Sequence, residues 1–127
     1  MMMNFLSVAI GGALGAMARY AVGIWLGAIS ATPPYIATLS VNVIGCALMG
    51  VIAASLPYAP FWQGVGRSLI MVGFLGALTT FSSFAFDSFT LLEKQQYGVM
   101  IAYMTTSFAL SLAAFFLLYH LTRWGLS

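Results

Sequence analysis

The chain has 127 residues, of which 62% are apolar and only 5% are charged, and its formal net charge is +2. A soluble domain carries about 25% charged residues, so this composition excludes a water-soluble globular protein. The positive charge is too small and too scattered to indicate nucleic-acid binding, and no nucleic-acid partner is expected. A membrane helix needs about 20 mostly apolar residues, and four such stretches account for the chain as one transmembrane domain over residues 1–127.

The first membrane helix is expected over residues 4–29. No basic residue precedes Arg19, so the positively charged start of a secretory signal peptide is missing and the helix is expected to stay on the protein. Gly11 and Gly15 are about one helical turn apart, a spacing that lets a second helix approach closely in lipid. Residues 30–34 include two consecutive prolines, which cannot continue a helix, and are predicted to form a turn.

Three further membrane helices are expected over residues 35–56, 61–92 and 97–121. Tryptophan and tyrosine residues lie near most of the predicted ends, and such rings prefer the membrane–water interface. The second helix carries one strongly polar residue at its middle, Asn42, and a single cysteine, Cys46, which we interpret as a small packing residue.

The basic residues divide evenly between the two sides of the membrane. Four helices put both termini and the loop after the second helix on one side, together with Arg67 and Arg123. Lys94 lies on the other side, and Arg19 lies within the first helix toward it. The positive-inside rule then gives no preferred orientation. Two interpretations stay open on charge alone: too few charges to decide, or a chain that inserts both ways and forms an antiparallel dimer.

The third predicted helix is longer than one crossing needs, and Gly73 and Gly76 precede Thr79 and Thr80 within it. Glycine and β-branched residues weaken a helix. A break would free backbone carbonyl groups at membrane depth, where they can coordinate a cation. Spacing alone leaves a broken helix and a continuous helix with close-packing glycines equally open.

Several neutral polar or aromatic groups lie inside the spans, where polar groups are costly and often functional. Phenylalanine ring edges carry partial positive charge, and amide and hydroxyl groups donate hydrogen bonds, so both can face an anion. The candidates are Phe81 and Phe84, which flank Ser82; Asn42, with Thr38 one turn before it; and Tyr103, Ser107 and Ser111, which recur every four residues on one face. Each also has a structural interpretation: ring packing, hydrogen bonds between helices, or hydroxyl groups bonded to their own helix.

The only acidic residues, Asp87 and Glu93, both lie toward the end of the third helix. Proton-coupled transport usually needs a carboxylate or histidine inside the membrane. The interior therefore suits a small anion better than an organic cation. No nucleophile–base pair or metal-ligand cluster can be assembled, so an enzyme is not expected.

Three stretches of the sequence resemble one known family, the Fluc (CrcB) fluoride channels. The specific one is the third-helix sequence over residues 73–84, Gly-Phe-Leu-Gly-Ala-Leu-Thr-Thr-Phe-Ser-Ser-Phe; residues 11–20 and 42–45 are similar as well. The resemblance covers the whole chain. It implies an all-α membrane protein with four transmembrane helices, the third one broken, that forms an antiparallel, dual-topology homodimer. It also implies passive, fluoride-specific export through two pores in the bacterial inner (plasma) membrane, as a multi-pass protein.

The resemblance further implies roles for individual residues. The backbone carbonyls of Gly76 and Thr79 from both subunits would hold a structural sodium ion at the dimer centre. The fluoride pore would comprise an aromatic box (Phe81 and Phe84), a donor (Asn42, with Ser82 assisting) and a polar track (Thr38, Tyr103, Ser107 and Ser111), with Arg19 near a vestibule. Ala77 stands where a glycine is common, and Asp87 where a glutamate is common, which puts the role of Asp87 in doubt.

The alternative function is that of a small multidrug-resistance-type exchanger, which also has four helices and dual topology. Its mechanism needs a carboxylate deep in the first helix, and residues 4–29 contain none. A membrane subunit without transport activity would explain the hydrophobicity but not the polar face on three helices. The sequence therefore favours a fluoride channel with lipid, fluoride and a second copy of the chain as its partners.

Overall fold

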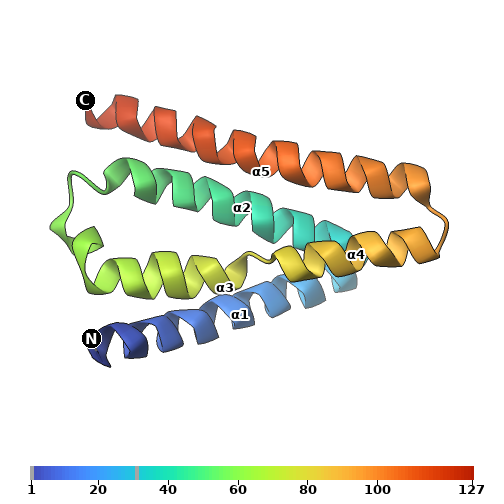
Figure 1. Cartoon of the computed structure of the whole chain (residues 1–127), viewed down its shortest axis with the longest axis horizontal. Coiled ribbons are helices and arrows are strands. Elements are labelled where there is room, and N and C mark those ends of the chain that lie inside the picture. Colours follow the sequence, from blue (N-terminus) through green and yellow to red (C-terminus); the bar gives the residue numbers. More distant parts are fainter. Residues whose placement is uncertain (1, 31) are drawn as a thin grey trace.

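The computed structural model describes residues 2–30 and 32–127, and this part of the chain is all helical (Figure 1). The elements in chain order are α1 (Met2–Ser30), α2 (Pro34–Ser55), η1 (Pro60–Gln63), η2 (Arg67–Leu75), α3 (Gly76–Leu78), α4 (Phe81–Glu93) and α5 (Tyr97–Leu126). Within the described residues, four helical stretches are long and apolar enough to cross a membrane, and η2, α3 and α4 together form one of them, the third span (Arg67–Glu93). The predicted all-α membrane class is confirmed.

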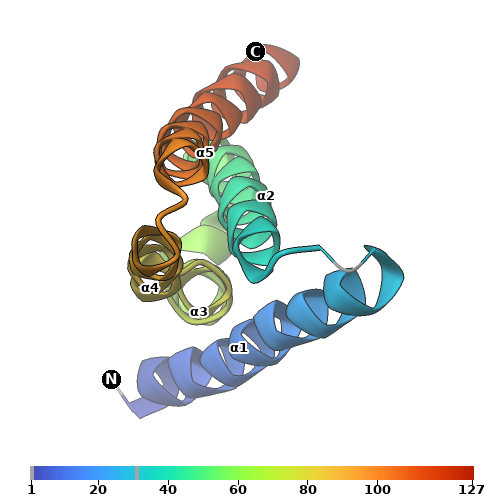
Figure 2. The ribbon, with the colours of Figure 1, turned by 90° about the vertical axis from the view of Figure 1, so that its right-hand side faces the viewer.

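The four spans lie lengthwise beside one another, and both chain ends lie at the same end of the bundle (Figure 1). Figure 2 shows α3 and α4 between α1 and α5. The Arg123 guanidinium lies 5.4 Å from the centre of the Tyr58 ring, which brings the C-terminal end of α5 to the loop after α2. This arrangement agrees with the predicted sidedness of the termini and the loop.

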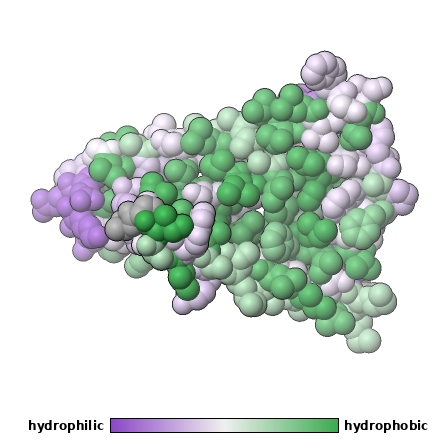
Figure 3. Space-filling view, turned by 180° about the vertical axis from the view of Figure 1, so that it is seen from behind, coloured by the Kyte–Doolittle hydropathy of each residue, from purple (hydrophilic) through white to green (hydrophobic). Residues whose placement is uncertain are grey.

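The buried core is small, and most of the surface is apolar. Val41, Ile52, Leu75 and Leu78 form the buried cluster. Large hydrophobic side chains along every span are exposed, and Figure 3 shows apolar surface over most of the visible face. Hydrophilic surface gathers at the end where α4 meets α5, around the exposed residues 93–96. An apolar belt with a polar end is the surface expected of a protein whose main solvent is lipid.

Close packing between α1 and the third span depends on two glycines. A Cβ atom added at Gly11 would collide with the backbone carbonyl of Leu69, and one at Gly15 would collide with that of Phe74. The close approach predicted from their spacing therefore occurs, and its partner is the third span of the same chain. Gly12, beside Gly11 in the sequence, has open space around it.

The third span departs from a regular α-helix along its length. Its helical turns begin at residue 65, later than the predicted start at 61, because the short 3-10 turn η1 and the non-helical Gly64 (φ −137°, ψ −124°) come first. Residues Arg67–Leu75 form wide π-type turns. Thr79 (φ −80°, ψ 153°) and Thr80 (φ −154°, ψ 124°) are both extended and stand between α3 and α4.

The other helix bounds lie close to the predicted ones, with one exception. α1 and α2 differ from the expected ranges by a few residues, and the predicted turn at 30–34 contains Ala31, which lies outside the described residues. α5 continues to Leu126, beyond the predicted end at 121, because residues 121–124 include no helix breaker.

Candidate functional site

The extended residue Thr80 is held by the side chain of Asn42, which projects from the middle of α2. The Thr80 backbone N–H donates to Asn42 Oδ1 at 2.8 Å, and Asn42 Nδ2 donates to the Thr80 backbone carbonyl at 3.1 Å. Thr80 is buried, so both of its backbone groups need a partner inside the protein. The sequence motif placed Asn42 near the site, but nothing in it pointed to Thr80 as the partner.

The side chain of Thr80 caps the start of α4. Its Oγ1 accepts a hydrogen bond from the Ser83 backbone N–H at 3.1 Å and donates to Ser83 Oγ at 3.2 Å. Ser82 Oγ lies 3.1 Å from the same hydroxyl. Threonine is a favoured residue at this capping position, because its oxygen satisfies an amide that has no partner in the first turn.

The N–H groups of Thr80 and Ser83, which these hydrogen bonds engage, would donate to backbone carbonyls in a continuous helix. A helical carbonyl accepts from the N–H four residues later, so Gly76 would accept from Thr80 and Thr79 from Ser83. The Thr80 N–H instead donates to Asn42, and the Ser83 N–H donates to the Thr80 side chain. The Gly76 and Thr79 carbonyls are thus left without their helical donors at membrane depth, where they need another partner. Such oxygens suit a small, hard cation.

An open groove of about 410 Å³ lies against the junction of α3 and α4. It gathers most of the predicted site residues from α2, the third span and α5. Its lining includes Asn42, Gly76, Thr79, Phe81, Phe84, Ser107 and Ser111, together with Cys46, Thr80, Phe108 and Leu112. Cys46, which we interpreted as a packing residue, therefore lines this groove, and its position one turn after Asn42 is the signal that could have revealed it.

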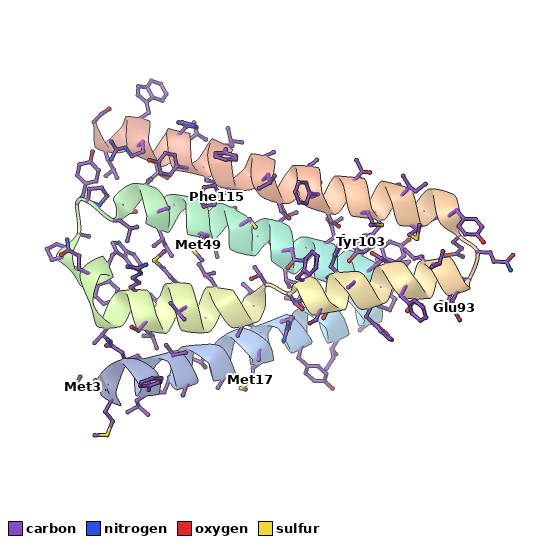
Figure 4. The ribbon with its side chains drawn as sticks, in the orientation of Figure 1. Met3, Met17, Met49, Glu93, Tyr103 and Phe115 are labelled. Carbon is purple, nitrogen blue, oxygen red and sulfur yellow. The ribbon has the colours of Figure 1, made fainter. Side chains whose placement is uncertain are left out.

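Aromatic rings form a continuous row from the groove into the bundle. The Phe81 and Phe84 ring centres are 5.4 Å apart, and Phe84 lies 5.4 Å from the Tyr103 ring, which lies 5.3 Å from Tyr35. Figure 4 shows Tyr103 between α5 and α4. Phe81, at the open end of the row, is 78% exposed, whereas Tyr103 at its inner part is 4% exposed.

The hydroxyl of Tyr103 donates to Asp87 Oδ2 at 3.3 Å. Asp87, shorter than the glutamate common at this position in the resembling family, therefore does reach a partner on α5. It also lines a second pocket, of about 360 Å³, beside Lys94. Tyr103 is engaged at its hydroxyl group and lines neither this pocket nor the groove.

The buried hydroxyl of Ser107 has no hydrogen-bond partner among the residues that the structure describes. Ser107 is 5% exposed and lines the groove one turn after Tyr103. A buried polar group without a partner costs free energy of about 1–3 kcal/mol, so it marks a place where a ligand can supply the missing contact.

The predicted residues Arg19 and Thr38 lie apart from this groove. Both line a pocket of about 540 Å³ between α1 and α2, with Ser83 from α4 on its wall. Ser83 thus connects the two regions, since its amide is bonded to Thr80. Ser82 lines neither pocket and points its hydroxyl toward Thr80.

Comparison with known proteins gives a consistent result over nearly the whole chain. The family described as "CrcB-like protein, Camphor Resistance (CrcB)" matches residues 6–119. Three relatives carry the name "Fluoride-specific ion channel FluC". The protein from Saccharophagus degradans is 45% identical over 115 residues, which cover 87% of this chain and 82% of the relative. The protein from Paracoccus denitrificans is 44% identical over 117 residues (87% of each chain), and that from Acidobacterium capsulatum is 40% identical over 119 residues (91% and 92%).

These relatives are named as ion channels rather than enzymes, as the sequence led us to expect of this chain. The four apolar spans and the bacterial relatives make the chain a multi-pass bacterial membrane protein. The matched range includes the whole third span and every residue of the groove, so the resemblance found in the third-helix sequence is confirmed: the chain belongs to the CrcB family.

Proposed function

We propose that this protein is a fluoride-specific ion channel that lets fluoride leave the cell passively across the bacterial inner membrane. The observation that carries the proposal is the composition of the groove. Amide and hydroxyl donors and the phenyl rings of Phe81, Phe84 and Phe108 line it, and no acidic side chain is among its described lining residues. The names of three relatives at 40–45% identity support the choice of fluoride as the ion.

Fluoride would lose its water to neutral partners in this groove. The free hydroxyl of Ser107 supplies one donor, and Asn42 has a second amide hydrogen after the first is given to Thr80. The ring edges of Phe81 and Phe84 add weak positive potential without a formal charge. Ser111, Thr38 and Tyr103 would continue a polar track, with Ser82 assisting near the junction. A neutral site that only partly replaces hydration lets the ion enter and also leave.

The working unit would be an antiparallel homodimer with dual topology. The groove is open, Phe81 is 78% exposed and Gly76 is exposed as well, so one copy leaves the site uncovered. A second copy crossing at the third span would close it. The balanced arginine and lysine positions support insertion in both orientations.

A sodium ion would hold the two third spans together at the dimer centre. The carbonyls of Gly76 and Thr79 fit this role, because their helical donors are taken by other partners and two copies together offer four oxygens. The ion, when bound, supplies fixed positive charge near the anion path. The extended dihedrals of Thr79 and Thr80 support a broken third helix as the element that presents these oxygens.

Arg19 would attract anions into the pocket between α1 and α2, which we propose as the vestibule. Long-range attraction by a single cation in a low-dielectric wall raises the local concentration of anions. The alternative function, a small multidrug-resistance-type exchanger, has no support in the relatives, and α1 lacks the carboxylate that it requires.

The test is electrode-monitored efflux from liposomes that contain the purified protein. Fluoride-loaded and chloride-loaded liposomes are compared under the same potassium gradient with valinomycin. We expect rapid fluoride release and no chloride release above that of protein-free liposomes. Equal release of both ions, or no release of either, would reject the proposed function.

A further inference from the structure

We propose that Thr80 is a positioning residue for the cation site: it keeps the Gly76 and Thr79 carbonyls free without coordinating the ion itself. This inference rests on the proposed sodium ion and deepens it. Two contacts carry it, the capture of the Thr80 N–H by Asn42 at 2.8 Å and the capture of the Ser83 N–H by Thr80 Oγ1 at 3.1 Å.

Both captures involve Thr80, by different groups. Its backbone N–H would donate to the Gly76 carbonyl in a continuous helix but donates to Asn42 instead. Its side chain accepts from the Ser83 N–H, which would otherwise donate to the Thr79 carbonyl. The same residue therefore controls both oxygens. Its extended backbone (φ −154°, ψ 124°) suits a β-branched side chain, and its burial at 8% exposure keeps water from competing for these bonds.

The Thr80 hydroxyl is fully engaged within α4. It accepts from the Ser83 amide, donates to Ser83 Oγ and has Ser82 Oγ at 3.1 Å. This leaves it little capacity to bind a cation, which separates its role from that of the two carbonyls. Without the hydroxyl, the Ser83 amide becomes free to pair with the Thr79 carbonyl as the third span rewinds toward a continuous helix.

The first experiment measures how sodium raises the unfolding temperature of the purified protein in detergent, with N-methylglucamine replacing sodium. Thr80→Val keeps the shape and the β-branch but removes the hydroxyl. We expect it to raise the sodium concentration at half-maximal stabilisation about three- to tenfold, which corresponds to the free energy of one hydrogen bond. Thr80→Ser restores the acceptor and should restore the wild-type midpoint. Thr90→Val, which removes an exposed hydroxyl bonded to its own helix, is the matched control.

A second variant tests the reason for the effect. Ser83→Pro removes the amide that would recapture the Thr79 carbonyl, and proline is tolerated in the first turn of a helix. Ser83→Pro alone should keep the wild-type sodium midpoint. The double variant Thr80→Val/Ser83→Pro should return the midpoint from the Thr80→Val value to the wild-type value. If Ser83→Pro instead weakens the response as Thr80→Val does, the cap acts only through general stability and the assignment is overturned.

The outcomes separate this inference from the proposed function. If Thr80→Val folds and shows the same sodium midpoint as the wild-type protein, the role of Thr80 is overturned and the channel proposal stands. A wild-type protein without any sodium response would remove the cation and the role of Thr80 together. Fluoride efflux from liposomes then decides the proposed function by itself.

Discussion

Asn42 and Thr80, 38 residues apart in the sequence, exchange two hydrogen bonds in the way that paired strand residues do, although both belong to helical spans. The side-chain amide of Asn42 takes the place that the backbone of a neighbouring strand would have. This pairing ties the middle of α2 to the extended residues Thr79 and Thr80 of the third span, so it supports both the groove and the carbonyls that lack their helical donors.

Asn42→Ala should therefore reduce stability as well as conduction. It leaves the buried N–H and carbonyl of Thr80 without their partners, and each unsatisfied group costs about 1–3 kcal/mol, so we expect a loss of about 2–6 kcal/mol. Denaturant titration in mixed micelles measures it. Ser40→Ala on the same helix removes only a hydroxyl bonded to the Ile36 carbonyl and should cost less than about 0.5 kcal/mol. Equal losses in the two variants would contradict the pairing.

Replacing Phe81 or Phe84 in the groove should nearly abolish fluoride efflux. Phe81→Ile and Phe84→Ile keep the apolar character but remove the ring edges proposed to face fluoride. The control is Phe86→Ile, an exposed ring on α4 that lies outside the groove, which should retain wild-type efflux. Wild-type flux in both Phe81→Ile and Phe84→Ile would reject the aromatic role.

Ser107→Ala should separate conduction from stability. The hydroxyl has no partner in the described structure, so its removal deletes an unsatisfied polar group, and the unfolding temperature without fluoride should stay the same or rise. Fluoride efflux should fall about three- to tenfold, because a donor to the ion is lost. A fall in the unfolding temperature would indicate that Ser107 has a structural partner and would contradict its proposed role.

Gly15→Ala should destabilise the protein, because its Cβ would collide with the Phe74 backbone carbonyl. The expected cost is about 1–3 kcal/mol, as for other overpacked sites. Gly12→Ala on the same helix meets nothing within contact distance and should be neutral or stabilise by up to about 1 kcal/mol through helix propensity. Thermal unfolding in detergent compares the two, and an equal response would contradict the close contact of α1 with the third span.

Arg19→Gln should lower fluoride efflux mainly at low ionic strength. The loss should shrink as salt is raised, since screening at about 0.15 M limits a charge to roughly 8 Å. Arg123→Gln, at the opposite end of the bundle beside Tyr58, should leave the salt dependence unchanged. A loss of flux that is the same at every ionic strength would contradict an electrostatic role for Arg19.

The sequence by itself determined the membrane class, the four spans and the family. These follow from local properties: hydropathy is a sum over neighbouring residues, prolines interrupt helices where they stand, and the residues 73–84 form one continuous pattern. The same locality explains why the predicted ends of α1 and α2 lie within a few residues of the observed ones.

Only the tertiary structure decided which groups meet. The spacing of Gly11 and Gly15 predicted a close helix contact, but it could not identify the third span as the partner. Tyr103 and Ser107 look equivalent as hydroxyl residues four apart, but Asp87 engages one and the other has no partner in the described structure. The freed carbonyls likewise depend on Asn42 capturing an amide from another helix. A hydrogen bond needs both partners within about 3 Å, and that distance is set by how distant segments pack, which no local pattern of residues contains.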